Sequence, residues 1–141
     1  MRGLTDEQQR AVTYPGSVVV RAGAGSGKTR VLAERAVWLM EAGLRPRELV
    51  AVTFTEAAAL ELRGRIAQTL EARTEAWSEG ALARLGEARI GTLHSLCATI
   101  LREHPVESGV GPGFEIETAP GTKRDLPNLD QALVQALEGG G

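Results

Sequence analysis

A glycine-rich loop is the segment of this 141-residue sequence whose residue types most clearly predict chemistry. The loop consists of Ala22-Gly23-Ala24-Gly25-Ser26-Gly27-Lys28-Thr29. Its glycines permit the backbone angles that turn successive N–H groups toward one anion. The Lys28 ammonium would reach the β- and γ-phosphates of a nucleotide, and the Thr29 hydroxyl would ligate Mg²⁺. We therefore predict a site for a nucleoside triphosphate and Mg²⁺ formed by residues 22–29, together with the neighbouring Arg30.

The segments on either side of this phosphate loop match the context that the motif requires. Residues 17–22, Ser-Val-Val-Val-Arg-Ala, are rich in branched side chains and follow Pro15-Gly16, so they predict a buried strand. Beyond the loop, apolar residues recur at helical spacing until Gly43 and Pro46 end the pattern. A helix that begins near Lys28 would direct the positive end of its dipole at a bound phosphate.

The remaining elements predict the class of fold. Thr5 and Gln8 predict a capping box at the start of a first helix. Strands are expected at 49–53 and 88–91, each followed by a helix, at 56–73 and 92–104. Alternating strands and helices predict an α/β domain whose parallel sheet is flanked by helices. A short strand at 114–116 and a last helix at 126–137 complete the expectation.

Acidic residues are absent from the position that hydrolysis of ATP normally requires, the end of a second apolar strand. The sequence contains three aspartates, Asp6, Asp125 and Asp130, and none of them ends a run of four apolar residues. We expect the chain alone to bind a nucleotide but to hydrolyse it feebly or not at all.

Composition limits the partners and the compartment. The formal net charge is −2, so contact with nucleic acid would depend on a few placed groups and not on a global basic field. Cys97 is the only cysteine, which excludes an internal disulfide, and we expect its thiol to be buried. The polar start of the sequence lacks the apolar stretch of a signal peptide, and no segment has the length of a membrane span. A cytoplasmic protein is expected.

Several motifs together resemble those of the UvrD/Rep-like superfamily 1 DNA helicases. Leu4-Thr5 with Gln8 and Ala11 is similar to the family's Q motif, whose glutamine recognises adenine. A side-chain amide has both the donor and the acceptor that the adenine edge requires. The resemblance therefore implies that Gln8 belongs to the same site as the phosphate loop, and that the nucleotide is ATP.

Two further segments resemble motifs that contact single-stranded DNA in that family. Residues 53–66 are similar to motif Ia, although Glu56-Ala57 replaces the usual Asn-Lys pair, and residues 90–97 are similar to the Thr-Phe-His-Ser motif. Hydroxyls where a strand meets a helix suit phosphate, and an aromatic ring offers a face to a base. The DNA contacts implied are Thr53, Phe54, Thr55, Thr92, His94 and Ser95. A core position for Phe54 is an equal alternative, and His104 is expected to be structural.

The match through Phe114-Glu-Ile116 resembles the AddA/RecB type of helicase-nuclease. It implies that residues 1–118 form the N-terminal part of a RecA-like motor domain and that 119–141 begin an inserted helical subdomain. In the family, the acidic motif II and the second motor half with its arginine follow later, so unwinding by these residues alone is not expected. Two alternatives stay open: a stand-alone P-loop nucleotide-binding protein, and a non-catalytic partner module of a motor.

Overall fold

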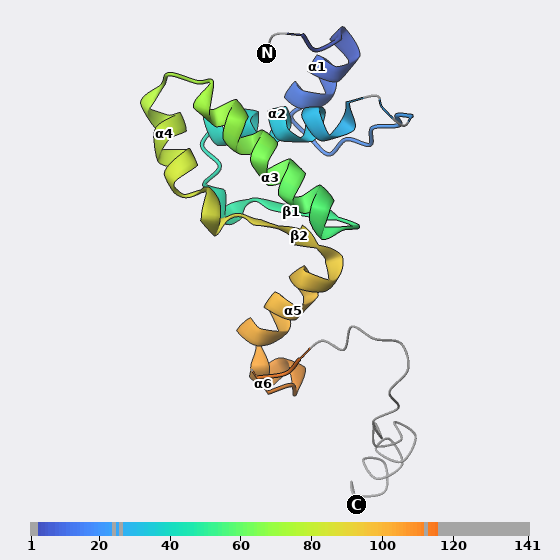
Figure 1. The fold of residues 1–141 in the computed structure, drawn as a ribbon, viewed down its shortest axis with the longest axis vertical. Coiled ribbons are helices and arrows are strands. Elements are labelled where there is room, and N and C mark those ends of the chain that lie inside the picture. Colours follow the sequence, from blue (N-terminus) through green and yellow to red (C-terminus); the bar gives the residue numbers. More distant parts are fainter. Residues whose placement is uncertain (1–2, 24, 26, 112, 116–141) are drawn as a thin grey trace, which may run out of the picture.

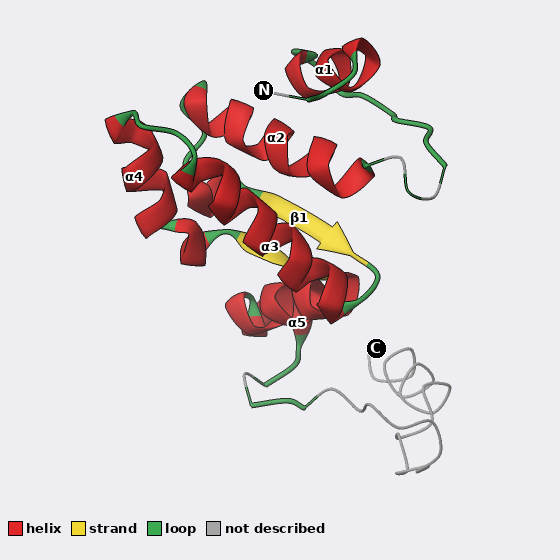
Figure 2. Cartoon of the chain, turned by 45° about the horizontal axis from the view of Figure 1, so that its top comes forward, coloured by secondary structure: helices red, strands yellow, loops and turns green. Residues whose placement is uncertain are grey.

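The chain forms a stack of helices on a short parallel sheet. The computed structural model describes residues 3–23, 25, 27–111 and 113–115. From the top of Figure 1 downward, α1, α2 and α3 lie above the two strands, and α5 lies below them. The turned view in Figure 2 again places α1 and α2 at one end of the stack and α5 at the other, with α3 crossing in front of the strands. In this part of the chain no helix is both long and apolar enough to cross a membrane.

Helix α1 (Asp6–Thr13) begins with the predicted capping box. The Gln8 backbone N–H donates to Thr5 Oγ1 at 3.2 Å, and the Thr5 N–H donates to Gln8 Oε1 at 3.0 Å. These two bonds satisfy N–H groups that have no partner inside the helix. The fully buried Val12 packs α1 onto the next helix, α2 (Lys28–Glu41).

Helices α2 and α3 (Glu56–Glu71) supply most of the core. Val37 and Met40 of α2 are buried, as are Leu62, Ile66 and Leu70 of α3, which recur at the spacing of one helical face. Ile66 is completely enclosed, so its truncation to alanine would cost about 2–5 kcal/mol. The core fixes the direction of both helices, and both begin on the same side of the molecule (Figure 1).

The sheet consists of β1 (Val50–Thr53) and β2 (Arg89–Thr92), which run parallel with Val50 opposite Arg89 and Thr53 opposite Thr92. A short 3₁₀ helix, η1 (Pro46–Glu48), leads into β1. There, hydrogen bonds from the Arg45 side chain and backbone lower the pKa of Glu48 to about 2. Parallel strands end at the same edge, so the helices that follow, α3 and α5 (Leu93–Glu103), begin side by side.

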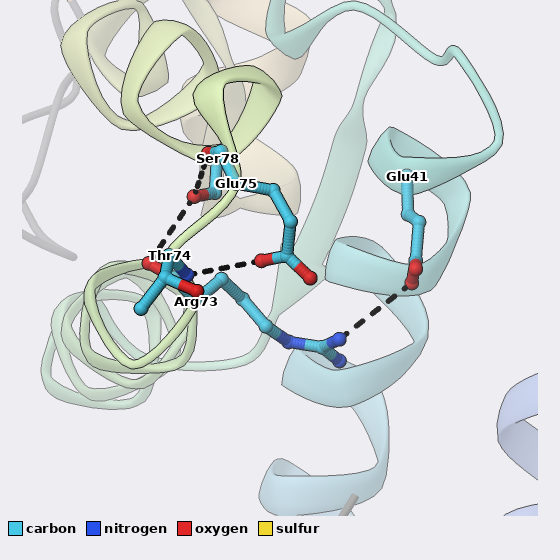
Figure 3. A network of polar contacts seen from close by, with 5 residues as sticks. All are labelled: Glu41, Arg73, Thr74, Glu75 and Ser78. Atoms are coloured by element: carbon cyan, nitrogen blue, oxygen red, sulfur yellow. Dashed lines mark hydrogen bonds and ion pairs between the residues drawn. The ribbon is translucent and has the colours of Figure 1, made fainter.

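Helix α4 (Ala76–Ala83) was not expected from the sequence. Trp77 and Ala81, followed by Leu85 of η2 (Leu85–Glu87), pack on the core and provide the periodic signal that would have indicated it. Figure 3 shows how its start is fixed: Ser78 Oγ donates to the Glu75 carbonyl at 2.7 Å, and Arg73 faces Glu41 at 3.8 Å. The corner between α3 and α4 is thereby tied to the end of α2.

The predicted strand at 17–22 is wrong. Residues 17–22 are extended but belong to no sheet, and Val19 is 97% exposed. The physical reason is that a strand needs a neighbour for its backbone N–H and C=O groups. Among the described residues the only strand pair is β1 with β2. Residues 17–22 therefore have no neighbouring strand to bond with, and their branched side chains stay exposed.

Other expectations differ in smaller ways. Cys97 is exposed, not buried, because α5 turns the neighbouring Ala98 toward the interior. The chain beyond α5 forms one more helical turn, α6 (Pro105–Ser108), and Phe114 and Glu115 are not in a strand. Ile116 and the helix expected at 126–137 lie outside the described residues, as does the whole segment 119–141.

Candidate functional site

Two glycines of the phosphate loop have backbone angles that suit an anion site. Gly25 and Gly27 have φ angles of 75° and 79°, in the left-handed region that favours glycine. Gly27 is the N-cap of α2, and among the described residues no side chain caps this helix. The N–H groups of its first turn therefore face the loop without a side-chain acceptor. Ala24 and Ser26 lie outside the described residues.

Lys28 bends back onto the loop that precedes it. Its Nζ donates to the carbonyl oxygens of Ala22 at 2.9 Å and Gly23 at 2.7 Å. The ammonium thereby joins the beginning of the loop, residues 22–23, to its end at Lys28. A phosphate entering the loop would compete with these two carbonyls for the lysine.

Gln8 lies beside the phosphate loop although nearly twenty residues separate the two in sequence. A Cβ atom added to Gly27 would lie 3.3 Å from Gln8 Nε2, so the amide group sits directly against Gly27. Thr5, Gln8, Ala22 and Lys28 line one hollow of about 290 Å³ between α1 and α2. This α1–α2 hollow joins a donor for a base edge to a cation for a phosphate.

Two residues that the sequence did not single out also line the α1–α2 hollow, Glu7 and Arg21. Arg21 adds a second cation to the lining, whereas Glu7 adds an anion. No motif marks either residue. Only the packing of α1 against α2 brings them there, so sequence spacing offered no signal for them.

Thr29 and Arg30 lie at different places relative to this hollow. Thr29 is half-buried in the first turn of α2, next to Lys28. The Arg30 guanidinium donates to the Gly3 carbonyl at 3.1 Å. Arg30 also borders a larger hollow of about 490 Å³ between α2 and α3, together with Arg65 and Arg73. That hollow lacks the glycine-rich backbone of the phosphate loop.

Arg35 fixes the relative position of α1 and α2, and sequence reasoning missed it. Its guanidinium donates to four carbonyls: Ala11, Val12 and Tyr14 at 2.9–3.0 Å and Gly16 at 2.9 Å. These carbonyls belong to the last turn of α1 and the turn after it, which have no helical partners. Arg35 therefore holds Gln8's helix against the helix that begins at the phosphate loop.

A second group of candidate residues gathers where β1 and β2 end. We call it the strand-end surface, and it comprises Thr53, Phe54, Thr55, Thr92, His94 and Ser95. Thr55 Oγ1 caps α3 by accepting from the Ala58 N–H at 3.2 Å, and Thr92 Oγ1 caps α5 by accepting from the Ser95 N–H at the same distance. Phe54 is fully exposed, which rules out a core position for its ring.

Polar contacts hold the strand-end surface together, both within each half and, through Glu56 of α3, between the two halves. Thr92, only 9% exposed, donates from Oγ1 to Glu56 Oε1 at 3.0 Å, and Thr53 Oγ1 donates to the Thr55 carbonyl at 2.9 Å. Ser95 Oγ donates to the Thr92 carbonyl at 2.9 Å and lies over Gly91, where a Cβ would approach it to 2.5 Å. His94 is exposed beside them.

Comparison with known proteins identifies the family to which the chain belongs. The family model for the UvrD/REP helicase N-terminal domain matches residues 4–138. The chain belongs to this family. DNA helicase II of Escherichia coli is 39% identical over 132 residues, which cover 92% of this chain and 17% of that protein. The family resemblance inferred from the motifs is thereby confirmed.

Relatives of a second kind within this UvrD/REP family match equally well. An ATP-dependent helicase/nuclease subunit of Heliobacterium modesticaldum is 38% identical over 118 residues, covering 79% of this chain and 8% of that protein. Its counterpart of the same name in Acetivibrio thermocellus is 40% identical over 143 residues, covering 95% and 11%. The chain thus spans less than a fifth of the length of these relatives. The chain is 38–40% identical to the DNA helicase II and to both helicase/nuclease subunits, so sequence identity does not assign it to either kind of relative.

Proposed function

We propose that this chain is the ATP-binding N-terminal portion of the first motor domain of a DNA helicase or helicase-nuclease of DNA repair or recombination. The single observation that carries this proposal is the α1–α2 hollow, where Gln8 and Lys28 lie together. In this proposal residues 22–30 hold the phosphates and Gln8 recognises adenine. The RecA-like arrangement and the boundary near residue 118 are part of the same proposal.

The residues present fit ATP with Mg²⁺. The left-handed Gly25 and Gly27 turn backbone N–H groups toward an anion, Lys28 supplies the cation, and Thr29 would ligate Mg²⁺. Bound Mg²⁺ would neutralise charge on the phosphates. In the described part of the chain no three acidic, histidine or cysteine side chains cluster as a metal site. Because none of the three aspartates in the sequence ends an apolar run, we expect efficient turnover to need a further acidic residue and an arginine from a second motor half.

Single-stranded DNA is the proposed polymer ligand of the strand-end surface. The helices α3 and α5 begin there side by side, and the exposed Phe54 offers a ring on which a base can stack. The names of the relatives, DNA helicase and helicase/nuclease, support DNA as the substrate. With few phosphates neutralised, we expect weak binding with a shallow dependence on salt.

A partner module is the second candidate function, and one observation favours it. Val50 and Val52 on one face of β1 are about half exposed, and the extended run at 18–20 is exposed as well. Apolar strand residues without a cover suit docking onto a complementary motor half. A self-sufficient small P-loop enzyme would be expected to cover such residues within its own fold.

Titration of a fluorescent ATP analogue with Mg²⁺ tests the proposed nucleotide site. The wild-type chain should give a saturable signal in the weak range, and Lys28→Ala should weaken it at least about tenfold because the cation facing the β- and γ-phosphates is lost. Arg65→Ala is the matched control, since it removes a cation from the other hollow. Equal signals from wild type and Lys28→Ala would discredit the site.

A further inference from the structure

Glu56 occupies the centre of the strand-end surface. It is the first residue of α3, directly after the N-cap Thr55, and its backbone lies at the positive end of a 16-residue helix. Because β1 and β2 are parallel and Thr53 is opposite Thr92, the beginning of α5 lies beside it. The carboxylate of Glu56 therefore stands between two helix N-termini, where a negative charge is favoured.

The contact between Glu56 and Thr92 has a defined direction. A hydroxyl has one proton, and Thr92 Oγ1 already accepts from the Ser95 N–H at 3.2 Å. Ser95 Oγ donates its own proton to the Thr92 carbonyl at 2.9 Å. Ser95 Oγ also lies within reach of the Thr92 hydroxyl, at 3.3 Å, but Glu56 Oε1 is nearer, at 3.0 Å, and a carboxylate is the stronger acceptor, so the proton of Thr92 points to Glu56. This almost buried hydroxyl is engaged by a carboxylate from the neighbouring helix.

We infer that Glu56 is an internal competitor for a phosphate group of single-stranded DNA on this surface. The inference rests on the proposed DNA contact of the strand-end surface. A carboxylate that accepts a hydroxyl proton between two helix N-termini uses the same donors that a phosphodiester would use. Single-stranded DNA must displace the Glu56 side chain or bind close to its negative charge. Either requirement lowers the affinity of the surface for DNA.

The chain offers a matched control in Glu61. Glu61 lies on the same helix and has the same charge, but its carboxylate accepts from Arg65 Nε at 2.9 Å, one turn further along α3. Glu56→Gln and Glu61→Gln change the net charge equally. Glu56→Gln also keeps an oxygen that can accept the Thr92 proton, so it isolates the effect of charge.

Binding of a fluorescein-labelled oligothymidylate, measured by anisotropy at low salt, tests the inference. Glu56→Gln should bind about three- to tenfold more tightly than wild type, because one like charge close to a phosphate is removed. Its log–log salt slope should be steeper by up to about 0.7, the value for one additional phosphate on a single strand. Glu61→Gln should stay within about twofold of wild type. Glu56→Ala, which removes both charge and acceptor, should bind at least as tightly as Glu56→Gln.

The outcomes separate this inference from the proposed function. Weaker or unchanged binding by both Glu56 variants, with a wild type that binds and loses affinity on Phe54→Ala, would overturn the competitor role alone. Equal tightening by Glu56→Gln and Glu61→Gln would also overturn it, because net charge would then explain the gain. If neither wild type nor any variant bound the oligonucleotide, the proposed DNA contact would fall, and the inference with it.

Discussion

Gln8 serves local structure and proposed recognition at once. Its Oε1 accepts from the Thr5 N–H in the capping box, while its Nε2 lies against Gly27 of the phosphate loop. A carbonyl oxygen has two lone pairs, so the same atom can accept a further bond from a nucleotide base. The spacing Thr5-x-x-Gln8 predicted the cap from local chemistry, but the contact with Gly27 depends on how α1 docks.

Gln8→Glu separates the two tasks of this residue. Glutamate keeps the capping box, so the thermal midpoint should stay within a few degrees of wild type. A carboxylate cannot donate to adenine and places a negative charge near the phosphates, so affinity for the fluorescent ATP analogue should fall about tenfold or more. The measurement is the same titration, followed by a melting curve.

Gln9→Glu is the control for this substitution, because Gln9 is the exposed neighbour on α1 and the added charge is the same. An equal loss of affinity in both variants would show that charge on α1, and not the Gln8 amide, governs binding.

The surface residues show where local pattern stops being informative. Phe54 and Cys97 were open to interpretation as core residues, yet both are exposed. Their burial is decided by what covers the end of β1 and the outer side of α5, and single-residue hydrophobicity does not describe that cover. Thr55 and Thr92, by contrast, follow from local chemistry, since a threonine before a helix predicts a cap.

At the scale of elements, the helices α1, α2, α3 and α5 and the strand pair were predictable because their signals are local, whereas α4 and α6 were not expected. The apolar spacing of α3 and the branched residues of β1 indicate these elements without knowledge of the rest of the chain. The run at 17–22 has an equally strong strand pattern but finds no neighbouring strand among the described residues. Strand pattern predicts the preference of a segment, whereas pairing depends on the sheet around it.

The docking of α1 on α2 depends on Arg35, which makes four bonds to main-chain carbonyls. Arg35→Lys keeps the charge but loses the planar fork that reaches several carbonyls together. The half-buried carbonyls of Ala11 and Val12 would lose their partner, so the free energy of unfolding should fall by about 1–3 kcal/mol. Urea unfolding followed by circular dichroism measures this change.

The exposed Arg10 at the end of α1 provides the comparison, since Arg10→Lys makes the same exchange outside this cluster of carbonyls. A loss of stability of the same size in Arg10→Lys, or none in Arg35→Lys, would show that the four bonds do not hold α1 in place.

At the scale of the whole molecule, two candidate surfaces lie on one side of the stack. The helices that begin at the phosphate loop and at the strand-end surface, α2 and α3, start on the same side in Figures 1 and 2. The core between these helices, which includes Val37 and Ile66, fixes the position of the beginning of α2 relative to the beginning of α3. Because the formal net charge is −2, the chain has no overall positive field, and any binding of anions would depend on the groups at these two surfaces.

The relatives extend far beyond the length matched here, and we propose that this chain is the part that holds the nucleotide. Its exposed strand residues agree with the proposal that other segments or proteins complete the motor. The proposed function depends on one event, the binding of a triphosphate in the loop at residues 22–29.

Soaking crystals of the chain in excess ATP with Mg²⁺ tests whether residues 22–29 bind a triphosphate. We predict density for a triphosphate against the backbone N–H groups from Gly25 to Thr29, with the Lys28 ammonium moved from the carbonyls of Ala22 and Gly23 onto the phosphates and Gln8 facing the base. A loop without nucleotide at saturating ATP, or a nucleotide bound instead between α2 and α3 beside Arg65 and Arg73, would contradict it.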